Sequence, residues 1–217
     1  MNVTMNLNDA PAEGIHKPVC EIELLIHAFS VNNPGLTVKK SEVLKYSATA
    51  EKNCIMLQRG SIAMRRRGDG MVVTSERAPF IFGLENQPGI SDTMYLHCLE
   101  ECDIRFISLE QANTIVATEN LWKAFVHVLI YTTSRVFEHC TQVHHMSAYD
   151  IIRYQLYELL KESEEVRMST TVAKYIKSRT YLSRSGIMRI LSELKTGKYI
   201  SIDNGILKGI NYLPKKY

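Results

Sequence analysis

The sequence predicts an α+β protein in which a strand-rich first half, a long helix and a basic helical region follow one another. Residues 37–107 contain short apolar runs separated by turn residues, which is typical of a barrel or sandwich. From Ser108 onward, apolar residues recur at three- and four-residue steps, as they do in helices. Residues 1–150 carry 13 Lys and Arg against 17 Asp and Glu, whereas residues 151–217 carry 13 against 6. The basic second part is expected to meet a polyanion.

The composition excludes several classes of protein. Hydrophobic residues make up 45% and charged residues 23% of the 217 residues, which is ordinary for a folded chain. No apolar run reaches the ~20 residues that a membrane span needs, and no secretory signal stands at the start. The 5 cysteines are scattered and odd in number, so they suit a reducing compartment better than a disulfide framework. We therefore expect a cytoplasmic protein without a membrane partner.

The first 118 residues are expected to hold an arm and a β-barrel domain. Residues 1–20 contain three turn formers and no sustained period, which predicts a flexible arm. Residues 21–118 are assigned to the barrel. Within them, residues 61–65 and 71–73 flank a glycine-rich turn and predict a β-hairpin. Further short strands are expected at residues 54–57, 78–83, 95–98 and 104–107.

A long helix is expected over residues 119–146, after a shorter one that begins with the capping box Ser108 to Gln111. A helix of this length with bulky apolar groups needs a partner along its whole length. It could pack against the strand domain alone, but we favour a homodimer seam. The residues predicted to line that seam are Trp122, Phe125, Leu129, Val136, Cys140 and Val143.

Residues 147–217 are expected to form a second domain. Apolar spacing predicts helices at residues 151–160 and 172–177, the latter capped by Ser169 or Thr170. A third helix and a hairpin complete the domain. Three helices followed by a hairpin in a basic region is the order of a winged helix-turn-helix domain.

The third helix of this domain begins at Ser183 and ends near Gly197. A helix fits the major groove, where an arginine can donate two parallel hydrogen bonds to guanine. An ordinary solvated surface helix is the alternative. The residues predicted to contact DNA on this helix are Ser183, Arg184, Ser185, Met188 and Arg189. The cations predicted to neutralise phosphates around it are Lys174, Lys177, Arg179, Lys195, Lys198 and Lys208.

Residues 183–194, SRSGIMRILSEL, resemble the recognition helix of the CRP/FNR regulators, whose usual pattern is Ser-Arg-Glu-x-x-x-Arg-x-Leu-x-x-Leu. Motifs at residues 78–84, 149–153, 197–200 and 210–214 are similar to those of the enterobacterial IprA (YaiV) family, a CRP-like group linked to oxidative-stress resistance. The resemblance implies a cyclic-nucleotide-binding-like barrel, a dimerisation helix and a transcription regulator that binds double-stranded DNA, in oxidative-stress or virulence control. RNA polymerase is then a candidate further partner.

Two departures from the CRP/FNR pattern change these expectations. In that family a Gly-Glu pair and a downstream arginine belong to the phosphate cassette, where the arginine and backbone N–H groups hold the cyclic phosphate. Here Leu84 follows Gly83 where the glutamate is expected, and no arginine lies between Arg77 and Arg105. We therefore expect no cyclic nucleotide and no other cofactor. Ser185 replaces the glutamate after the first recognition arginine, so the preferred DNA sequence should differ.

A redox- or metabolite-responsive sensor that uses the barrel is one alternative. Cys98 and Cys102 form Cys-x-x-x-Cys, but the neighbouring Glu100 and Glu101 would raise a thiol pKa rather than lower it. An FNR-type iron–sulfur cluster needs a group of N-terminal cysteines. Residues 1–50 contain only Cys20.

A cupin-like enzyme or a pure interaction module is the other alternative. A cupin needs a His-x-His pair with a glutamate, and the histidines here do not give that spacing. The pair His144 and His145 lies at a helix end, where a cation suits the helix dipole without a metal. No nucleophile elbow, phosphate loop or placed carboxylate pair occurs. We expect neither an enzyme nor a metal site.

Overall fold

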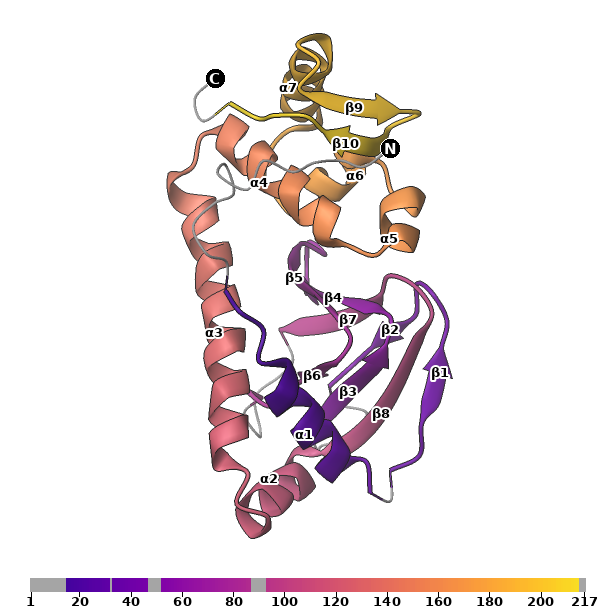
Figure 1. Cartoon of the computed structure of the whole chain (residues 1–217), viewed down its shortest axis with the longest axis vertical. Coiled ribbons are helices and arrows are strands. Elements are labelled where there is room, and N and C mark those ends of the chain that lie inside the picture. Colours follow the sequence, from indigo (N-terminus) through magenta and orange to yellow (C-terminus); the bar gives the residue numbers. More distant parts are fainter. Residues whose placement is uncertain (1–14, 32, 47–51, 87–92, 215–217) are drawn as a thin grey trace.

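The computed structural model describes residues 15–31, 33–46, 52–86 and 93–214, and only the backbone of residues 139–145. Figure 1 shows a strand-rich domain, a long helix α3 along its side, and a smaller helical domain with a hairpin beyond the end of that helix. The predicted α+β architecture is confirmed. No helix in these ranges is long and apolar enough to cross a membrane.

Two four-stranded antiparallel sheets form the barrel, with strand orders β1-β8-β3-β6 and β2-β7-β4-β5. Apolar residues on facing sides of the strands fill the space between the sheets, and Ile55, Leu57 and Leu96 are fully buried there. Gly60 joins β3 to β4 with a positive φ, where a Cβ would lie 2.6 Å from a backbone oxygen. The strands are β1 (Leu36–Val38), β2 (Val43–Leu44), β3 (Asn53–Arg59), β4 (Ser61–Arg66), β5 (Val72–Arg77), β6 (Phe80–Phe82), β7 (Met94–Cys98) and β8 (Cys102–Ser108).

Helix α1 (Val19–Phe29) was not predicted. It begins inside the stretch assigned to a flexible arm, of which residues 1–14 lie outside the described chain. Ile22, Leu25 and Phe29 are fully buried in the barrel core, and the helix also packs against α3. The signal was present in the sequence, since these residues and Ile26 recur at helical spacing.

Two further helices follow the barrel. Ser108 caps α2 (Leu109–Thr118) by accepting a hydrogen bond from the backbone N–H of Gln111, as the capping box predicts. Helix α3 (Trp122–His145) follows, close to the predicted 119–146. Its inner side is buried against the barrel, so α3 belongs to the first hydrophobic core.

The C-terminal domain has its own core, which extends from Tyr149 to Leu213. Thr171 caps α6, in place of the predicted Ser169 or Thr170, and α5 was not predicted. The elements are α4 (Ala148–Lys161), α5 (Glu164–Ser169), α6 (Val172–Lys177), α7 (Arg184–Thr196), β9 (Ile200–Asp203) and β10 (Ile206–Ile210). The predicted helices and hairpin of this region are therefore all present.

Candidate nucleic-acid interface

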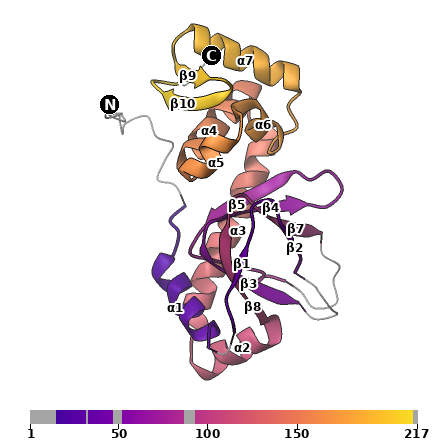
Figure 2. The ribbon, with the colours of Figure 1, turned by 90° about the vertical axis from the view of Figure 1, so that its right-hand side faces the viewer.

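Helix α7 presents one apolar and one polar face. Its inner side is buried in the core of the C-terminal domain through Ile187, Ile190, Leu191 and Leu194. Figure 2 shows α7 at the end of the molecule farthest from the barrel. The outward side chains are exposed and include Arg184, Ser185, Met188, Arg189 and Ser192. A helix anchored in this way can enter a groove without disturbing its own core.

The start of α7 is fixed by Ser183. Its hydroxyl accepts a hydrogen bond of 3.1 Å from the backbone N–H of Gly186 and lies 3.1 Å from the Ser185 hydroxyl. Ser183 is therefore a helix cap. The free N–H groups and the dipole at this N-terminus favour an anion such as a DNA phosphate.

The two arginines of the exposed face differ in their surroundings. Arg184 lies in the first turn and is exposed. Arg189 forms a 3.5 Å ion pair with Glu193, and its side chain is 70% exposed. Such a surface pair within one helix contributes about 0.3–0.5 kcal/mol, so Arg189 can leave it readily for a base edge.

Five of the predicted phosphate contacts are exposed lysines of the C-terminal domain. Lys177 donates a hydrogen bond of 3.1 Å to the carbonyl oxygen of Leu182, which holds it beside the start of α7. Lys198 follows α7 with a positive φ, and the Asn211 side chain donates to its carbonyl oxygen at 2.8 Å. The exposed lysines are Lys174, Lys177, Lys195, Lys198 and Lys208.

The prediction for Arg179 is wrong. Its side chain is only 10% exposed and pairs with Glu162 at 3.2 Å. Its guanidinium also lies 3.6 Å from the centre of the Tyr175 ring and donates to Ser75 on the barrel. Arg179 therefore faces the junction between the two domains, and Glu162 already neutralises it.

An apolar stripe runs along the outer side of α3. Exposed Trp122, Val126, Ile130 and Phe137 recur along it, whereas Phe125 is buried in the barrel core. Phe125 therefore does not fit the predicted seam, because its side of the helix packs on the barrel. The other predicted seam residues are half-buried Leu129 and Val136, and Cys140 and Val143, whose side chains lie outside the described residues.

Comparison with known proteins places the chain in a family. A protein of Salmonella typhimurium named Inhibitor of hydrogen peroxide resistance is 31% identical over 152 residues, which cover 70% of this chain and 73% of that protein. The Escherichia coli protein of the same name is 28% identical over 190 residues, which cover 87% of this chain and 88% of that protein. The chain belongs to this family. The resemblance found in the sequence is thus confirmed.

Solved structures give the fold of this family member. The c-di-GMP responsive global regulator CLP of Xanthomonas campestris is 12% identical and covers 88% of this chain and 100% of its own, with a TM-score of 0.68. A regulator of the crp/fnr family from Eubacterium rectale is 13% identical and covers 85% and 88%, with a TM-score of 0.63. Residues 148–215 match the family described as winged helix-turn-helix DNA binding. The chain has the fold of these CRP/FNR-type structures, and residues 148–215 form a winged helix-turn-helix DNA-binding domain.

The barrel of this family member differs from a cyclic-nucleotide site at Leu84. This side chain is buried in the barrel core and offers no polar group. Gly83 before it has a positive φ, and a Cβ there would lie 2.8 Å from the carbonyl oxygen of Asn53. The chain has the glycine turn at Gly83 but no carboxylate at position 84.

The cysteines of the barrel are buried. Cys54, Cys98 and Cys102 have no exposed surface, and burial raises the pKa of the Cys54 thiol to about 12. The Cys102 thiol donates to the carbonyl oxygens of Ser61 and Glu100 at 3.5 and 3.3 Å. Among the described residues, no group of three His, Cys, Asp or Glu side chains is placed to hold a metal ion.

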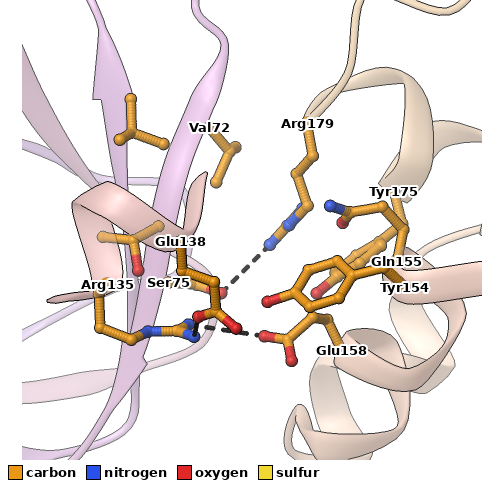
Figure 3. Close-up of a pocket in the computed structure, with 11 residues that line it drawn as sticks. Val72, Ser75, Arg135, Glu138, Tyr154, Gln155, Glu158, Tyr175 and Arg179 are labelled. Carbon is orange, nitrogen blue, oxygen red and sulfur yellow. Dashed lines mark hydrogen bonds and ion pairs between the residues drawn. The ribbon is translucent and has the colours of Figure 1, made fainter. Parts of the chain in front are cut away.

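A small polar cavity lies between the domains (Figure 3). It encloses about 30 Å³, against the ~300 Å³ or more of ordinary ligand pockets. Arg135 from α3 pairs across the cavity with Glu158 of α4 at 3.5 Å. Arg179 lies on the side of the cavity opposite Arg135. The cavity is part of the contact between the domains and is too small for a nucleotide.

Proposed function

We propose that this protein is a DNA-binding transcription regulator that acts as a homodimer on a roughly palindromic DNA site and needs no cyclic nucleotide. The observation that carries the proposal is the exposed face of α7, with Arg184 and Arg189 on a helix whose other face is buried. Two such helices, one per protomer, would enter successive major grooves about one helical turn apart.

The exposed stripe of α3 supports the homodimer. Soluble monomers rarely leave a long run of bulky apolar side chains in water. Trp122, Val126, Ile130 and Phe137 lie four, four and seven residues apart, which keeps them on one side of the helix. A second copy would cover the stripe and place both winged domains at the same end of the dimer.

The relatives' name supports a biological setting. Both are named for hydrogen peroxide resistance. We propose that the genes controlled by this regulator act in oxidative-stress resistance, that it works in the cytoplasm, and that it has no catalytic activity. RNA polymerase stays a candidate partner.

The test is fluorescence anisotropy of the full chain with labelled genomic promoter fragments, over a series of salt concentrations, with and without cAMP. We expect binding that falls steeply with salt, survives competitor DNA and is unchanged by cAMP. A requirement for cAMP would reject the lost nucleotide site. Binding that is equally strong to scrambled DNA would reject a sequence-specific regulator.

A further inference from the structure

Met188 is an apolar side chain in the middle of the polar face of α7. It is 50% exposed, and it belongs neither to the core of the C-terminal domain nor to the half-buried residues that pack on that core. Its helical neighbours on the same side are Arg184 and Ser185, one turn before it, and Ser192, one turn after it. Nothing in the fold of this domain requires a methionine here.

The surroundings of Met188 indicate what covers it. Exposed cations lie beside it on the helix, namely Arg184 one turn before it and Arg189 next to it. A basic surface of this kind attracts nucleic acid. The recognition face can offer the bases two kinds of contact, namely hydrogen bonds and apolar contacts. Thymine is the base that shows a methyl group in the major groove.

We propose that Met188 reads the methyl group of a thymine in the target DNA. The inference rests on the proposed function, because it requires α7 to lie in the major groove of a preferred site. Met188 follows Arg184 by one helical turn, which is about 6 Å along the helix axis. Base pairs are spaced by about 3.4 Å. The thymine and the base that Arg184 contacts are therefore expected to lie close together in one half-site.

The chemistry of the side chain suits this contact. A methionine side chain is unbranched and has a polarisable sulfur, so it adapts its shape to an irregular apolar surface. A cytosine at the same position offers no methyl group, and 5-methylcytosine restores one. Met188 therefore selects for a methyl group, whereas the arginines select for hydrogen-bond acceptors.

The experiment replaces each thymine of the preferred site, one at a time, by deoxyuridine, which removes only the methyl group. Binding is measured by competition anisotropy. For the unaltered protein we expect one position per half-site at which the affinity falls about fourfold, as for the loss of one buried methyl group. In Met188→Ala the same deoxyuridine replacement should leave the affinity unchanged. A further Arg184→Ala change should still weaken binding to the preferred site.

Two variants and one base complete the design. Met188→Leu keeps an apolar contact and should keep the deoxyuridine effect, whereas retained specific binding by Met188→Ala shows that this variant is folded. Met168→Ala removes an equally exposed methionine on α5 and should leave the effect unchanged. Cytosine in place of the sensitive thymine should weaken binding, and 5-methylcytosine should restore it.

The outcomes separate this inference from the proposed function. Specific binding that depends on Arg184, with the same deoxyuridine profile in Met188→Ala as in the unaltered protein, overturns the role of Met188 and leaves the regulator intact. If deoxyuridine has no effect at any position in the unaltered protein, the role of Met188 is likewise overturned and the regulator is left intact. A protein without a preferred DNA site overturns both.

Discussion

Glu100 of the barrel accepts a buried hydrogen bond of 2.8 Å from the Ser163 hydroxyl, which caps α5 in the C-terminal domain. The second carboxylate oxygen accepts one of 2.6 Å from Ser61. The backbone of Val72 donates to Ser178 across the same junction at 2.8 Å. The two hydrophobic cores share no residue, so directional polar contacts contribute to holding the domains in one orientation.

Replacement of Ser163 tests this junction. Ser163→Ala removes the helix cap, whose hydroxyl accepts from Val166, and leaves Glu100 with one donor fewer. We expect the free energy of unfolding to fall by about 1–3 kcal/mol. Chemical denaturation measures it, and Ser192→Ala, at an exposed serine of α7, is the matched control. Equal stability of the two variants would contradict the role of Ser163.

The arginines of α7 should read bases. Arg189→Ala is expected to weaken binding to the preferred site by about 1–3 kcal/mol and to relax specificity there. Lys195→Ala is the comparison, because a phosphate contact should weaken preferred and scrambled DNA alike and reduce the salt slope by about one. Anisotropy titrations on both DNAs measure these effects. An equal loss on both DNAs for Arg189→Ala would reject its role in base reading.

The winged domain could be predicted from the sequence because its signals are local. Ser183 caps α7, apolar residues repeat along one face of it, and Gly205 supplies the positive φ that the hairpin turn requires. None of these depends on where the rest of the chain lies. The apolar repeat identified the buried face of α7, and the remaining face is the exposed one, which is the candidate site.

The face of α3 could not be predicted in the same way. Phe125, Val126, Leu129 and Ile130 are all apolar and lie on different sides of the helix, so periodicity alone does not say which side meets the barrel. The packing of α3 against the barrel determines which side of the helix is buried. Arg179 was misassigned for a related reason, because its partner Glu162 and the nearby Ser75 lie at a junction that no local pattern reveals.

The stripe of α3 should hold the dimer together. Ile130 is 59% exposed on it, and Ile130→Glu would bring two carboxylates into the seam without disturbing the barrel core. We expect a monomer in sedimentation equilibrium and a large loss of affinity for the palindromic site. Val43→Glu, at an exposed apolar residue of β2, should remain a dimer. A dimeric Ile130→Glu protein would place the interface elsewhere.

His97 should make the stability depend on pH. Burial lowers the pKa of His97 below its ordinary value of 6.5, and the positive charges of Arg65 and Lys174 lower it further. Its Nδ1 is buried without a hydrogen-bond partner. Above pH 6.5 both the folded and the unfolded chain hold it neutral. As the pH falls below 6.5 the unfolded state takes up the proton first, so stability is lost.

His97→Gln should remove this part of the pH dependence. Denaturation at several pH values between about 7.5 and 5 gives the slope of the unfolding free energy, which should be smaller in the variant. His27→Gln changes an exposed histidine of α1 and should keep the slope of the unaltered protein. A slope that is unchanged in His97→Gln would show that other groups cause it.

The cysteines should separate a plain regulator from a thiol-based sensor. Cys20 is exposed, whereas Cys54, Cys98 and Cys102 are buried. A thiol reacts as the thiolate, and burial raises the pKa of Cys54 to about 12. The hydrogen bond with Cys98 lowers the pKa of Cys102, so its protection depends on its lack of exposed surface. In the native protein we expect iodoacetamide to modify Cys20 and to leave these three unmodified until the chain is unfolded.

Mass spectrometry of the alkylated peptides measures this difference. The functional counterpart is DNA affinity before and after peroxide treatment, compared between the unaltered protein and Cys98→Ser. We expect the two proteins to respond alike, because a thiol without exposed surface is not reached while the barrel stays closed. Rapid native alkylation of Cys98 or Cys102, together with a peroxide effect that Cys98→Ser abolishes, would instead make the barrel a redox sensor.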